Sequence, residues 1–371
     1  MNASNILKII KKSGIGKYLC QLLLPVVHDK IDCSETNIHL SRTLLQSISA
    51  DPCQSCIRNK PQVSTKQYDL QVIVPAYNTS KYIGTCIDSA LNLPISSSLI
   101  VTVINDGSTD NTGEILKKYS KDNRVEIITQ DNRGFSGARN RALTEIKGRY
   151  ITFLDSDDEF VGGGNFLDNL IHLADIEGLD IIECGYITFT EEHNIKTFRH
   201  ANTISNDTSI LYGYPWGKLI RANLFEKVQF PEGYWFEDTL MSFIIFPMCQ
   251  KIATSADILY RYRINPSGIS ATAKRKSKTI DSYWITEQLL TDRTVLGLKS
   301  DEAFYKIMLK QIKINYSRIH SLGRKDVDQA VFILTSNLLN EYFSKYKTES
   351  PLSTALSNGN FAQYKLLNDL T

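Results

Sequence analysis

The chain has 371 residues, of which 42% are hydrophobic and 22% are charged, and its formal net charge is +2. These values are ordinary for a globular protein with one large domain or two smaller ones. The near-neutral charge and the lack of a basic stripe argue against a nucleic-acid-binding protein. No apolar run is long enough to span a bilayer and no signal peptide is recognisable, so the sequence predicts a cytoplasmic protein.

Residues 1–66 are irregular in pattern and are expected to form an N-terminal extension. It opens with a basic amphipathic stretch, which fits either a peripheral helix at the inner face of the cell membrane or a helix packed on its own domain. The stretch consists of Ile6, Leu7, Lys8, Ile9, Ile10, Lys11, Lys12 and Lys17. The odd number of cysteines argues against a disulfide framework. Cys53 and Cys56 lack a second closely spaced pair, so reduced thiols are favoured over a zinc site.

From Tyr68 onward, strand-like and helix-like patterns alternate. The expected strands are 70–74, 99–104, 125–128 and 150–154, and the expected helices are 80–93, a helix starting near residue 110, and 137–146. This alternation favours an α/β fold with a parallel, doubly wound sheet. After residue 279, apolar residues recur at helical spacing. The expected division is therefore an extension (1–66), an α/β domain (67–270) and a helical region (271–371).

The most informative place is the segment Asp155-Ser156-Asp157-Asp158, which directly follows the apolar strand 150–154. Three carboxylates within four residues repel one another unless a cation or hydrogen-bond donors compensate their charge. Ligands of open α/β sheets bind just beyond the carboxyl ends of the strands. The plain alternative is an acidic turn that caps the next helix.

The loops after the other strands carry groups suited to a nucleotide diphosphate. A tyrosine ring offers a flat face to a base, a carboxylate can accept from a ribose hydroxyl, and arginines at a helix start favour phosphate. No P-loop or dinucleotide-binding glycine motif is present. The residues concerned are Pro75, Ala76, Tyr77, Asn78, Asp106, Arg133, Gly137 and Arg139.

The order of these motifs resembles that of the family 2 glycosyltransferases of GT-A fold. The matching segments are 74–78, 105–110, 137–140, 155–158, Trp216-Gly217-Lys218-Leu219, Glu237-Asp238 after three aromatic residues, and Tyr262-Arg263 followed by Gly268-Ile269-Ser270. The resemblance covers about residues 68–270. It is closest to bacterial enzymes that build capsule, O-antigen or other surface glycans.

The resemblance implies a role for each motif. Asp106 and Asp155 would hold the uridine and ribose, and Asp157, with Asp155, would bind Mn²⁺ or Mg²⁺. Asp238 would be the catalytic base, with Glu237 as the alternative. The implied nucleotide-sugar ligands are Pro75, Ala76, Tyr77, Asn78, Asp106, Arg133, Gly137, Arg139, Asp155, Ser156 and Arg263, and the implied acceptor ligands are Trp216, Trp235 and Glu237.

The expected activity is an inverting, metal-dependent transfer of a sugar from a UDP-sugar to a hydroxyl of a glycan or lipid-linked acceptor. Two alternatives remain: a non-catalytic nucleotide-sugar-binding scaffold, and a nucleotidyltransferase, although the latter normally has a glycine-rich basic loop after its first strand. Glu237-Asp238 could also be an ordinary helix start, and Trp216 a core residue. The C-terminal helices are expected to pack on the catalytic domain or on a second copy of the chain.

Overall fold

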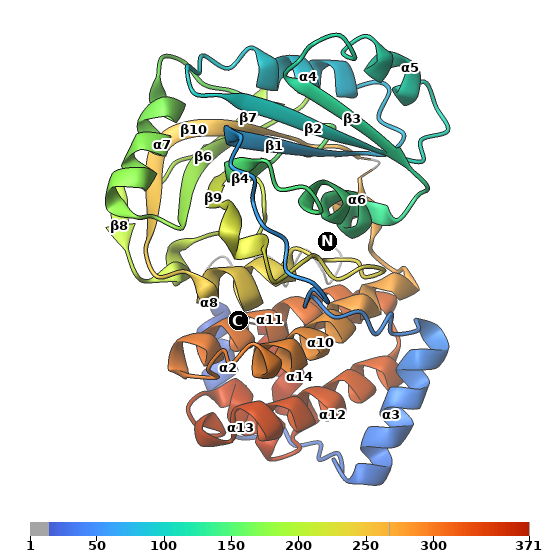
Figure 1. Ribbon diagram of the computed structural model, residues 1–371. Helices are drawn as coiled ribbons and strands as arrows, with labels where there is room; N and C mark the ends of the chain where they lie inside the picture. The colour runs from blue at the N-terminus through green and yellow to red at the C-terminus, as the bar shows by residue number, and fades with distance from the viewer. Residues whose placement is uncertain (1–14, 267, 371) are drawn as a thin grey trace. The chain divides into compact units, whose positions relative to one another are not determined.

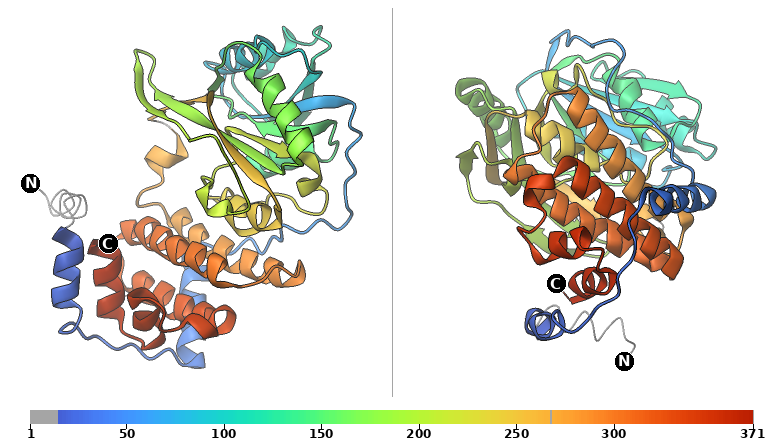
Figure 2. Two further views of the ribbon diagram at one scale, coloured as in Figure 1. Left: turned by 90° about the vertical axis from the view of Figure 1, so that its left-hand side faces the viewer. Right: turned by 90° about the horizontal axis from the view of Figure 1, so that it is seen from below.

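The computed structural model describes residues 15–266 and 268–370, and the chain divides into two compact units (Figures 1 and 2). The sheet unit contains Gln54–Gly233 and Glu237–Ala271. The helical unit contains the described residues of Met1–Cys53, Tyr234–Phe236 and Thr272–Thr371. Residues 15–53 therefore cluster with the C-terminal helices, and so do three residues from the middle of the sequence.

The sheet unit is built on a ten-stranded sheet in the order β3-β2-β1-β4-β9-β6-β10-β5, with β7 beside β6 and β8 beside β10. The first four strands in this order are parallel to one another, whereas β9 is antiparallel to both of its neighbours. The strands are β1 (Tyr68–Ala76), β2 (Leu99–Asp106), β3 (Val125–Gln130), β4 (Gly148–Phe153), β5 (Glu159–Phe160), β6 (Ile181–Phe189), β7 (Asn194–Phe198), β8 (Thr203–Ser205), β9 (Lys218–Arg221) and β10 (Ile252–Arg263).

The register of the central strands brings three loops to one edge of the sheet. Ala76 at the end of β1 pairs with Asn105 of β2, and Ile73 pairs with Phe153 of β4. Because β1, β2 and β4 are parallel, the segments that follow them all leave at their carboxyl ends. The apolar, largely β-branched sequences of these strands suit burial on both faces of a parallel sheet.

Helices cover both faces of this sheet (Figure 1). Alternate residues of β1, such as Leu70, Val72 and Val74, share one core with α4 (Ile83–Leu91), α5 (Thr112–Lys117) and α7 (Phe166–Glu177). The opposite face packs against α6 (Gly134–Leu143). The expectation of a doubly wound, mostly parallel sheet is therefore confirmed.

The segment after β9 packs beneath β4 through aromatic side chains. Phe153 makes edge-to-face contacts with Phe225 and Phe230, whose centroids lie 5.6 and 5.5 Å away. Such contacts hold the following chain against the sheet. The short elements of this segment are η2 (Ala222–Phe225), the π-helical turn η3 (Met241–Ile245) and α8 (Phe246–Met248). Two other short elements are η1 (Thr208–Ile210), before β9, and α9 (Ile269–Thr272), after β10.

The helical unit combines N-terminal and C-terminal elements. Helix α3 packs on α12, α2 lies beside α14, and the Ile31 N–H donates to the Gly359 carbonyl at 2.8 Å. Its core includes Phe332, Phe361 and Tyr364. The elements are α2 (Ile15–Leu23), α3 (Glu35–Ile48), η4 (Ser277–Ile280), α10 (Asp281–Val295), α11 (Glu302–Ile319), η5 (His320–Leu322), α12 (Lys325–Tyr342), η6 (Ser344–Tyr346), α13 (Pro351–Ser357) and α14 (Phe361–Leu370).

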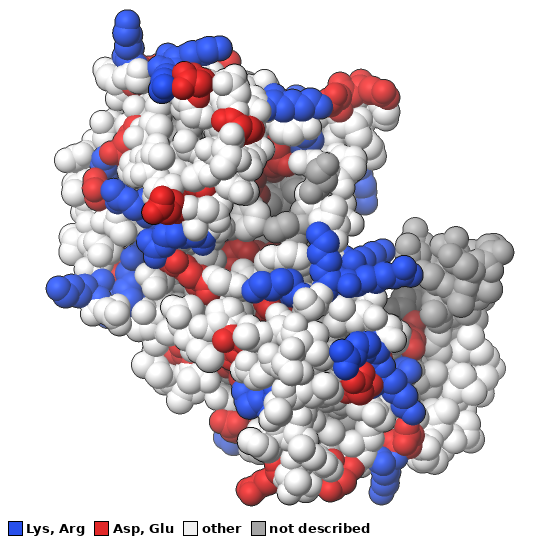
Figure 3. Space-filling view, turned by 90° about the vertical axis from the view of Figure 1, so that its right-hand side faces the viewer, with Lys and Arg blue, Asp and Glu red and all other residues white. Residues whose placement is uncertain are grey.

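Charges of both signs are interspersed on the face shown in Figure 3, in keeping with 42 basic and 40 acidic residues. Within residues 15–266 and 268–370, no helix combines the length and apolar character needed to cross a bilayer. The basic stretch at residues 6–12 lies outside the described residues.

Candidate functional site

The loop after β1 is tied to the loop after β2. Asn78 adopts a left-handed backbone with φ of 50°, which asparagine tolerates better than most residues. Its Oδ1 accepts from the Thr109 N–H at 2.8 Å, and its own N–H donates to Ser108 Oγ at 3.0 Å. Pro75 and Ala76 form the buried end of β1, whereas 48% of Tyr77 is exposed. The tyrosine ring is therefore available at the carboxyl ends of β1, β2 and β4, here called the strand edge.

Asp106 is a fixed, buried carboxylate at the end of β2. Its Oδ1 accepts from Gln130 Nε2 at 2.7 Å and from the Arg133 N–H at 2.9 Å. The next residue, Gly107, has φ of 72°, and a Cβ there would lie 2.8 Å from the Asn132 nitrogen. Only glycine fits this turn, which lets the chain pass close to the loop before α6.

The start of α6 contains the next group of expected ligands. The Arg133 side chain, 53% exposed, pairs with Glu232 at 2.8 Å. Gly137 lies so close to Arg133 that it has no room for a Cβ. Asn140 exchanges two hydrogen bonds with the Phe230 backbone, at 2.8 and 2.9 Å. The first turns of α6 thus hold the segment 230–232 next to the strand edge.

Arg139 joins two carboxylates from distant parts of the sequence. Its Nη2 lies 3.0 Å from Asp155 Oδ1 and its Nη1 lies 2.5 Å from Glu237 Oε1, and the residue is 3% exposed. Its guanidinium also lies over the Phe230 ring, 5.3 Å from the centroid. Burial lowers the pKa of Arg139, but the charges of Asp155 and Glu237 raise it more strongly, so the side chain stays charged.

The carboxylate loop after β4, residues 155–158, is held by hydrogen bonds to the Tyr260 hydroxyl. Its hydroxyl accepts from the Asp155 N–H at 3.1 Å and donates to Asp158 Oδ2 at 2.8 Å. The Arg263 N–H donates to the other Asp158 oxygen at 2.6 Å. Burial, together with the charges of Asp155 and Asp157, raises the pKa of Asp158 well above its usual range. Asp158 and Ser156 are both buried, so they form the support of this loop.

Asp157 faces a second set of partners. Its Oδ2 accepts from Asn265 Nδ2 at 2.9 Å. Burial raises the pKa of Asp157, the Asn265 hydrogen bond opposes this effect, and the charge of Asp155 adds to it. The Arg263 side chain donates to the Asp157 carbonyl at 2.7 Å and pairs with Glu159 at 2.9 Å. Arg263 therefore braces the carboxylate loop.

The carboxylate loop fits a divalent cation by its chemistry. Asp155 and Asp157 are hard oxygen donors of the kind that Mn²⁺ and Mg²⁺ prefer, and the charge of Asp155 raises the pKa of Asp157. In the described part of the chain, no three His, Cys, Asp or Glu side chains form a ready-made metal cage. A cation here would take its remaining ligands from a bound phosphate and from water.

The expected acceptor residues lie in different surroundings. Trp216 is 7% exposed and stacks on Tyr214 and Tyr260, with centroids 3.8 and 4.5 Å away. Trp235 belongs to the helical unit. Asp238 is partly buried in the sheet unit, where its carbonyl accepts from the N–H of Met241 at 2.9 Å at the start of η3. The acceptor role of each stays a prediction.

The structure adds residues that sequence motifs did not reveal. Tyr260 and Asn265 flank the expected Tyr262-Arg263 motif, so proximity to that motif was their only signal. The pairing of Arg139 with Glu237 spans 98 positions of the sequence. No local pattern encodes a contact of that kind.

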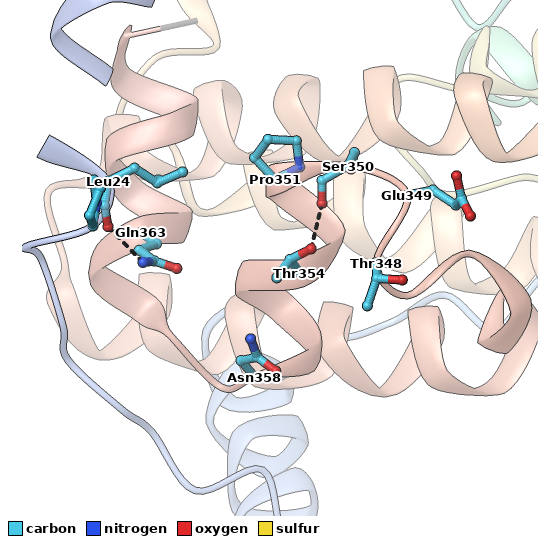
Figure 4. A pocket seen from close by; sticks show the side chains of 9 residues that line it. Leu24, Thr348, Glu349, Ser350, Pro351, Thr354, Asn358 and Gln363 are labelled. Carbon is cyan, nitrogen blue, oxygen red and sulfur yellow. Dashed lines mark hydrogen bonds between the residues drawn. The ribbon is translucent and has the colours of Figure 1, made fainter. Parts of the chain in front are cut away.

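A separate hollow lies in the helical unit (Figure 4). It has a volume of about 480 Å³ and is lined by Leu24, Pro25, Thr348, Glu349, Ser350, Pro351, Thr354, Asn358 and Gln363. Gln363 donates to the Leu24 carbonyl at 2.7 Å, and the Thr354 hydroxyl donates to the Ser350 carbonyl at 2.9 Å. One carboxylate among neutral side chains offers little chemistry, so the strand edge remains the candidate site.

Comparisons with known proteins agree with the motifs. The Glycosyl transferase family 2 model matches residues 71–235. Glycosyltransferase GlyA of Streptococcus pneumoniae is 32% identical over 220 residues, which cover 54% of this chain and 31% of GlyA. Chondroitin synthase of Escherichia coli is 47% identical over 157 residues, 42% of this chain and 20% of the synthase. The chain thus spans less than a third of either relative.

The fold has a solved counterpart. The crystal structure of Staphylococcus aureus TarS residues 1–349 in complex with UDP-GlcNAc matches with a TM-score of 0.62 and 19% identity, covering 80% of this chain and 89% of that chain. This likeness confirms the expected GT-A fold. Residues 71–235 are therefore similar to glycosyltransferase family 2, and the chain has the GT-A fold.

Proposed function

We propose that this protein is an inverting, metal-dependent glycosyltransferase of surface polysaccharide synthesis. It would move a hexosyl or N-acetylhexosaminyl group from a UDP-sugar to a hydroxyl of a glycan or lipid-linked acceptor. The observation that carries the proposal is the buried Arg139, which binds Asp155 of the carboxylate loop and Glu237, the neighbour of Asp238. One ion-pair network thus connects the expected donor side with the expected acceptor side.

The donor would lie across the carboxyl ends of β2, β1 and β4. Tyr77 offers its exposed ring to the base, and the fixed carboxylate of Asp106 can accept from a base N–H or a ribose hydroxyl. The presence of UDP-GlcNAc in the TarS structure supports a UDP-sugar as donor. The similarity to a chondroitin synthase supports a polysaccharide product.

Asp157, with Asp155, would hold Mn²⁺ or Mg²⁺. The cation would neutralise negative charge on the departing UDP. Asn265 and Arg263 orient Asp157 through its side chain and its carbonyl, respectively. Arg139 orients Asp155 in the same way. The chain's own contribution is therefore to present two carboxylates in a fixed arrangement before the donor arrives.

Asp238 would act as the base. It takes the proton from the acceptor hydroxyl while that oxygen bonds to C1 of the sugar and the bond from C1 to the UDP oxygen breaks. A single displacement of this kind inverts the configuration at C1. Glu237 places its Oε1 on Arg139, which favours Asp238 over Glu237 for this role.

The Asp238→Asn variant tests the proposal. UDP release would first be measured with a panel of UDP-sugars, using p-nitrophenyl glycosides of glucose, N-acetylglucosamine and glucuronic acid as acceptors with Mn²⁺. Transfer by the variant should fall by about 10²-fold or more, because the base is lost while the shape is kept. UDP binding measured by calorimetry should be unchanged.

The exposed Asp257 in β10 provides a matched control, since Asp257→Asn makes the same chemical change away from the strand edge. Transfer by Asp238→Asn within a few-fold of the unmodified protein would reject Asp238 as the base. UDP binding without turnover of any donor would instead support the nucleotide-sugar-binding scaffold.

A further inference from the structure

Helix α2 of the helical unit presents apolar side chains on the face that points away from the unit. Its inner face contains the buried residues Gly16 and Cys20, and α2 packs beside α14 (Figure 2). The outer face is formed by Tyr18, Leu22 and Val26, which are four residues apart and therefore follow one another along the helix. We propose that this outer face docks on an anionic membrane surface.

The side chains of the outer face are strongly exposed. The exposed fraction is 63% for Tyr18, 55% for Leu22 and 69% for Val26, and the neighbouring Leu23 is 40% exposed. These four residues are here called the apolar stripe. An aromatic ring with a hydroxyl, such as that of Tyr18, suits the boundary between acyl chains and water, because one end is apolar and the other is polar.

The backbone beneath the apolar stripe is held by the rest of the helical unit. The helical hydrogen bonds continue past the end of α2, since the Leu24 N–H donates to the Cys20 carbonyl at 2.9 Å and the Val27 N–H donates to the Leu23 carbonyl at 3.1 Å. Gln363 of α14 donates to the Leu24 carbonyl at 2.7 Å (Figure 4). Contacts on the inner side therefore fix this segment, and the stripe remains open for a partner.

The apolar stripe differs from ordinary exposed apolar residues because its members are contiguous. A single exposed apolar side chain is common on globular proteins and needs no partner. Leu40 of α3 is such a residue: it is 58% exposed, but Thr36 and Thr43, one helical turn before and after it, are exposed and polar. Successive turns of the stripe, in contrast, carry apolar or aromatic side chains only. A continuous apolar surface of this kind typically marks a contact with a membrane or with another protein.

The charge of the surrounding sequence favours a membrane. Residues 1–28 contain four lysines and no aspartate or glutamate, and the first carboxylate of the chain is Asp29. Glu349 lines the hollow beside Leu24 and Pro25, so one negative charge opposes four positive ones. The lysines are Lys8, Lys11, Lys12 and Lys17; the first three lie outside the described residues, and their charge follows from the sequence alone.

An anionic lipid surface matches both properties at once. Lysines near such a surface are attracted to the lipid headgroups, while an apolar helix face inserts at the boundary with the acyl chains. The two contributions are separable, because salt screens only the first. The inference goes beyond the proposed activity and does not depend on which carboxylate acts as the base.

The Leu22→Ser/Val26→Ser double variant of the full chain tests the inference. Sedimentation would be measured with vesicles of phosphatidylcholine and phosphatidylglycerol in equal parts, and with vesicles of phosphatidylcholine alone. The unmodified protein should sediment with the anionic vesicles at low salt and much less with the neutral ones. The double variant should bind the anionic vesicles about 10-fold more weakly or less, because two inserting side chains are lost while every lysine is kept.

A matched control and a second readout accompany this measurement. Leu40→Ser removes an exposed leucine from the same unit and should leave vesicle binding unchanged. In the Tyr18→Trp variant, the difference in tryptophan emission from the unmodified protein should shift to shorter wavelength when anionic vesicles are added, because the ring enters an apolar environment. The thermal stability of the double variant should be retained, since both of its altered side chains are exposed.

Each other outcome has a defined meaning. Equal vesicle binding by the double variant and the unmodified protein would overturn the inference, and so would a lack of sedimentation with anionic vesicles at low salt. Self-association that the double variant loses, without vesicle binding by either protein, would assign the stripe to a second copy of the chain and reject the membrane. UDP-sugar turnover on p-nitrophenyl acceptors should be the same in all of these variants, so a failure of docking is distinguishable from a failure of the proposed function.

Discussion

Replacing Arg139 by methionine should destabilise the sheet unit by about 3 kcal/mol. Removing one member of a buried ion pair typically costs about 3–5 kcal/mol, because the partner is left uncompensated. Here two partners lose their cation, but the side chains of Asp155 and Glu237 remain 29% and 14% exposed. Water can therefore partly solvate them, which places the expected cost at the lower end of the range.

Urea denaturation followed by circular dichroism measures this cost. Arg141→Met is the matched control, because Arg141 lies on the same helix, is 35% exposed and approaches Glu145 only to 3.9 Å. The Arg141→Met substitution should reduce the free energy of unfolding by less than about 0.5 kcal/mol. The Arg139→Met and Glu237→Gln changes should be non-additive by about 0.5–3 kcal/mol. A cost under about 1 kcal/mol for Arg139→Met, with no coupling, would refute the electrostatic reasoning.

Three further predictions concern the metal, the N-terminus and pH. Asp157→Ala, like EDTA, should abolish UDP-sugar turnover without unfolding the protein, and full turnover in chelator would exclude the metal. We propose that the basic N-terminus contacts anionic membranes. Deleting residues 1–14 should therefore reduce the sedimentation of the protein with phosphatidylglycerol vesicles at low salt but preserve turnover on p-nitrophenyl acceptors. Unchanged sedimentation would reject the contact. The Asp328 hydrogen bond raises the pKa of His320, so this pair stabilises the fold below that pKa and ceases to do so as pH rises through it. His320→Gln should therefore reduce the unfolding free energy at about pH 5.5, by less than about 1 kcal/mol for this half-exposed side chain, but not at about pH 9; an equal effect at both pH values would contradict the assignment.

The sequence predicted the parallel core well, because local signals are strong there. The apolar runs of β1, β2 and β4 and the turn residues after them locate the strands within a few positions. Asp106 and the carboxylate loop therefore fall at the expected edge. Helix α6 begins at Gly134, three residues before the expected start, because the glycine and polar residues there are compatible with a first helical turn.

Contacts between distant segments could not be predicted in the same way. The link from Arg139 to Glu237 and the hydroxyl of Tyr260 beneath Asp158 depend on how β4, α6 and β10 pack. The grouping of Trp235 with the helical unit likewise depends on the buried Asp281, which reads as an ordinary acidic residue near a helix start. Sequence patterns report local preferences, whereas these pairs are set by tertiary packing.

The packing of α3 on α12 has a consequence for the timing of synthesis. The whole sheet unit is encoded between these two helices, and chains grow at roughly 5–20 residues per second. Helix α3 therefore leaves the ribosome on the order of ten to fifty seconds before its partner exists. The sheet unit can fold in that interval, while the segment around Ser49 and Asp51 waits for α10–α12. A nascent chain should thus be able to bind nucleotide before its helical unit is complete.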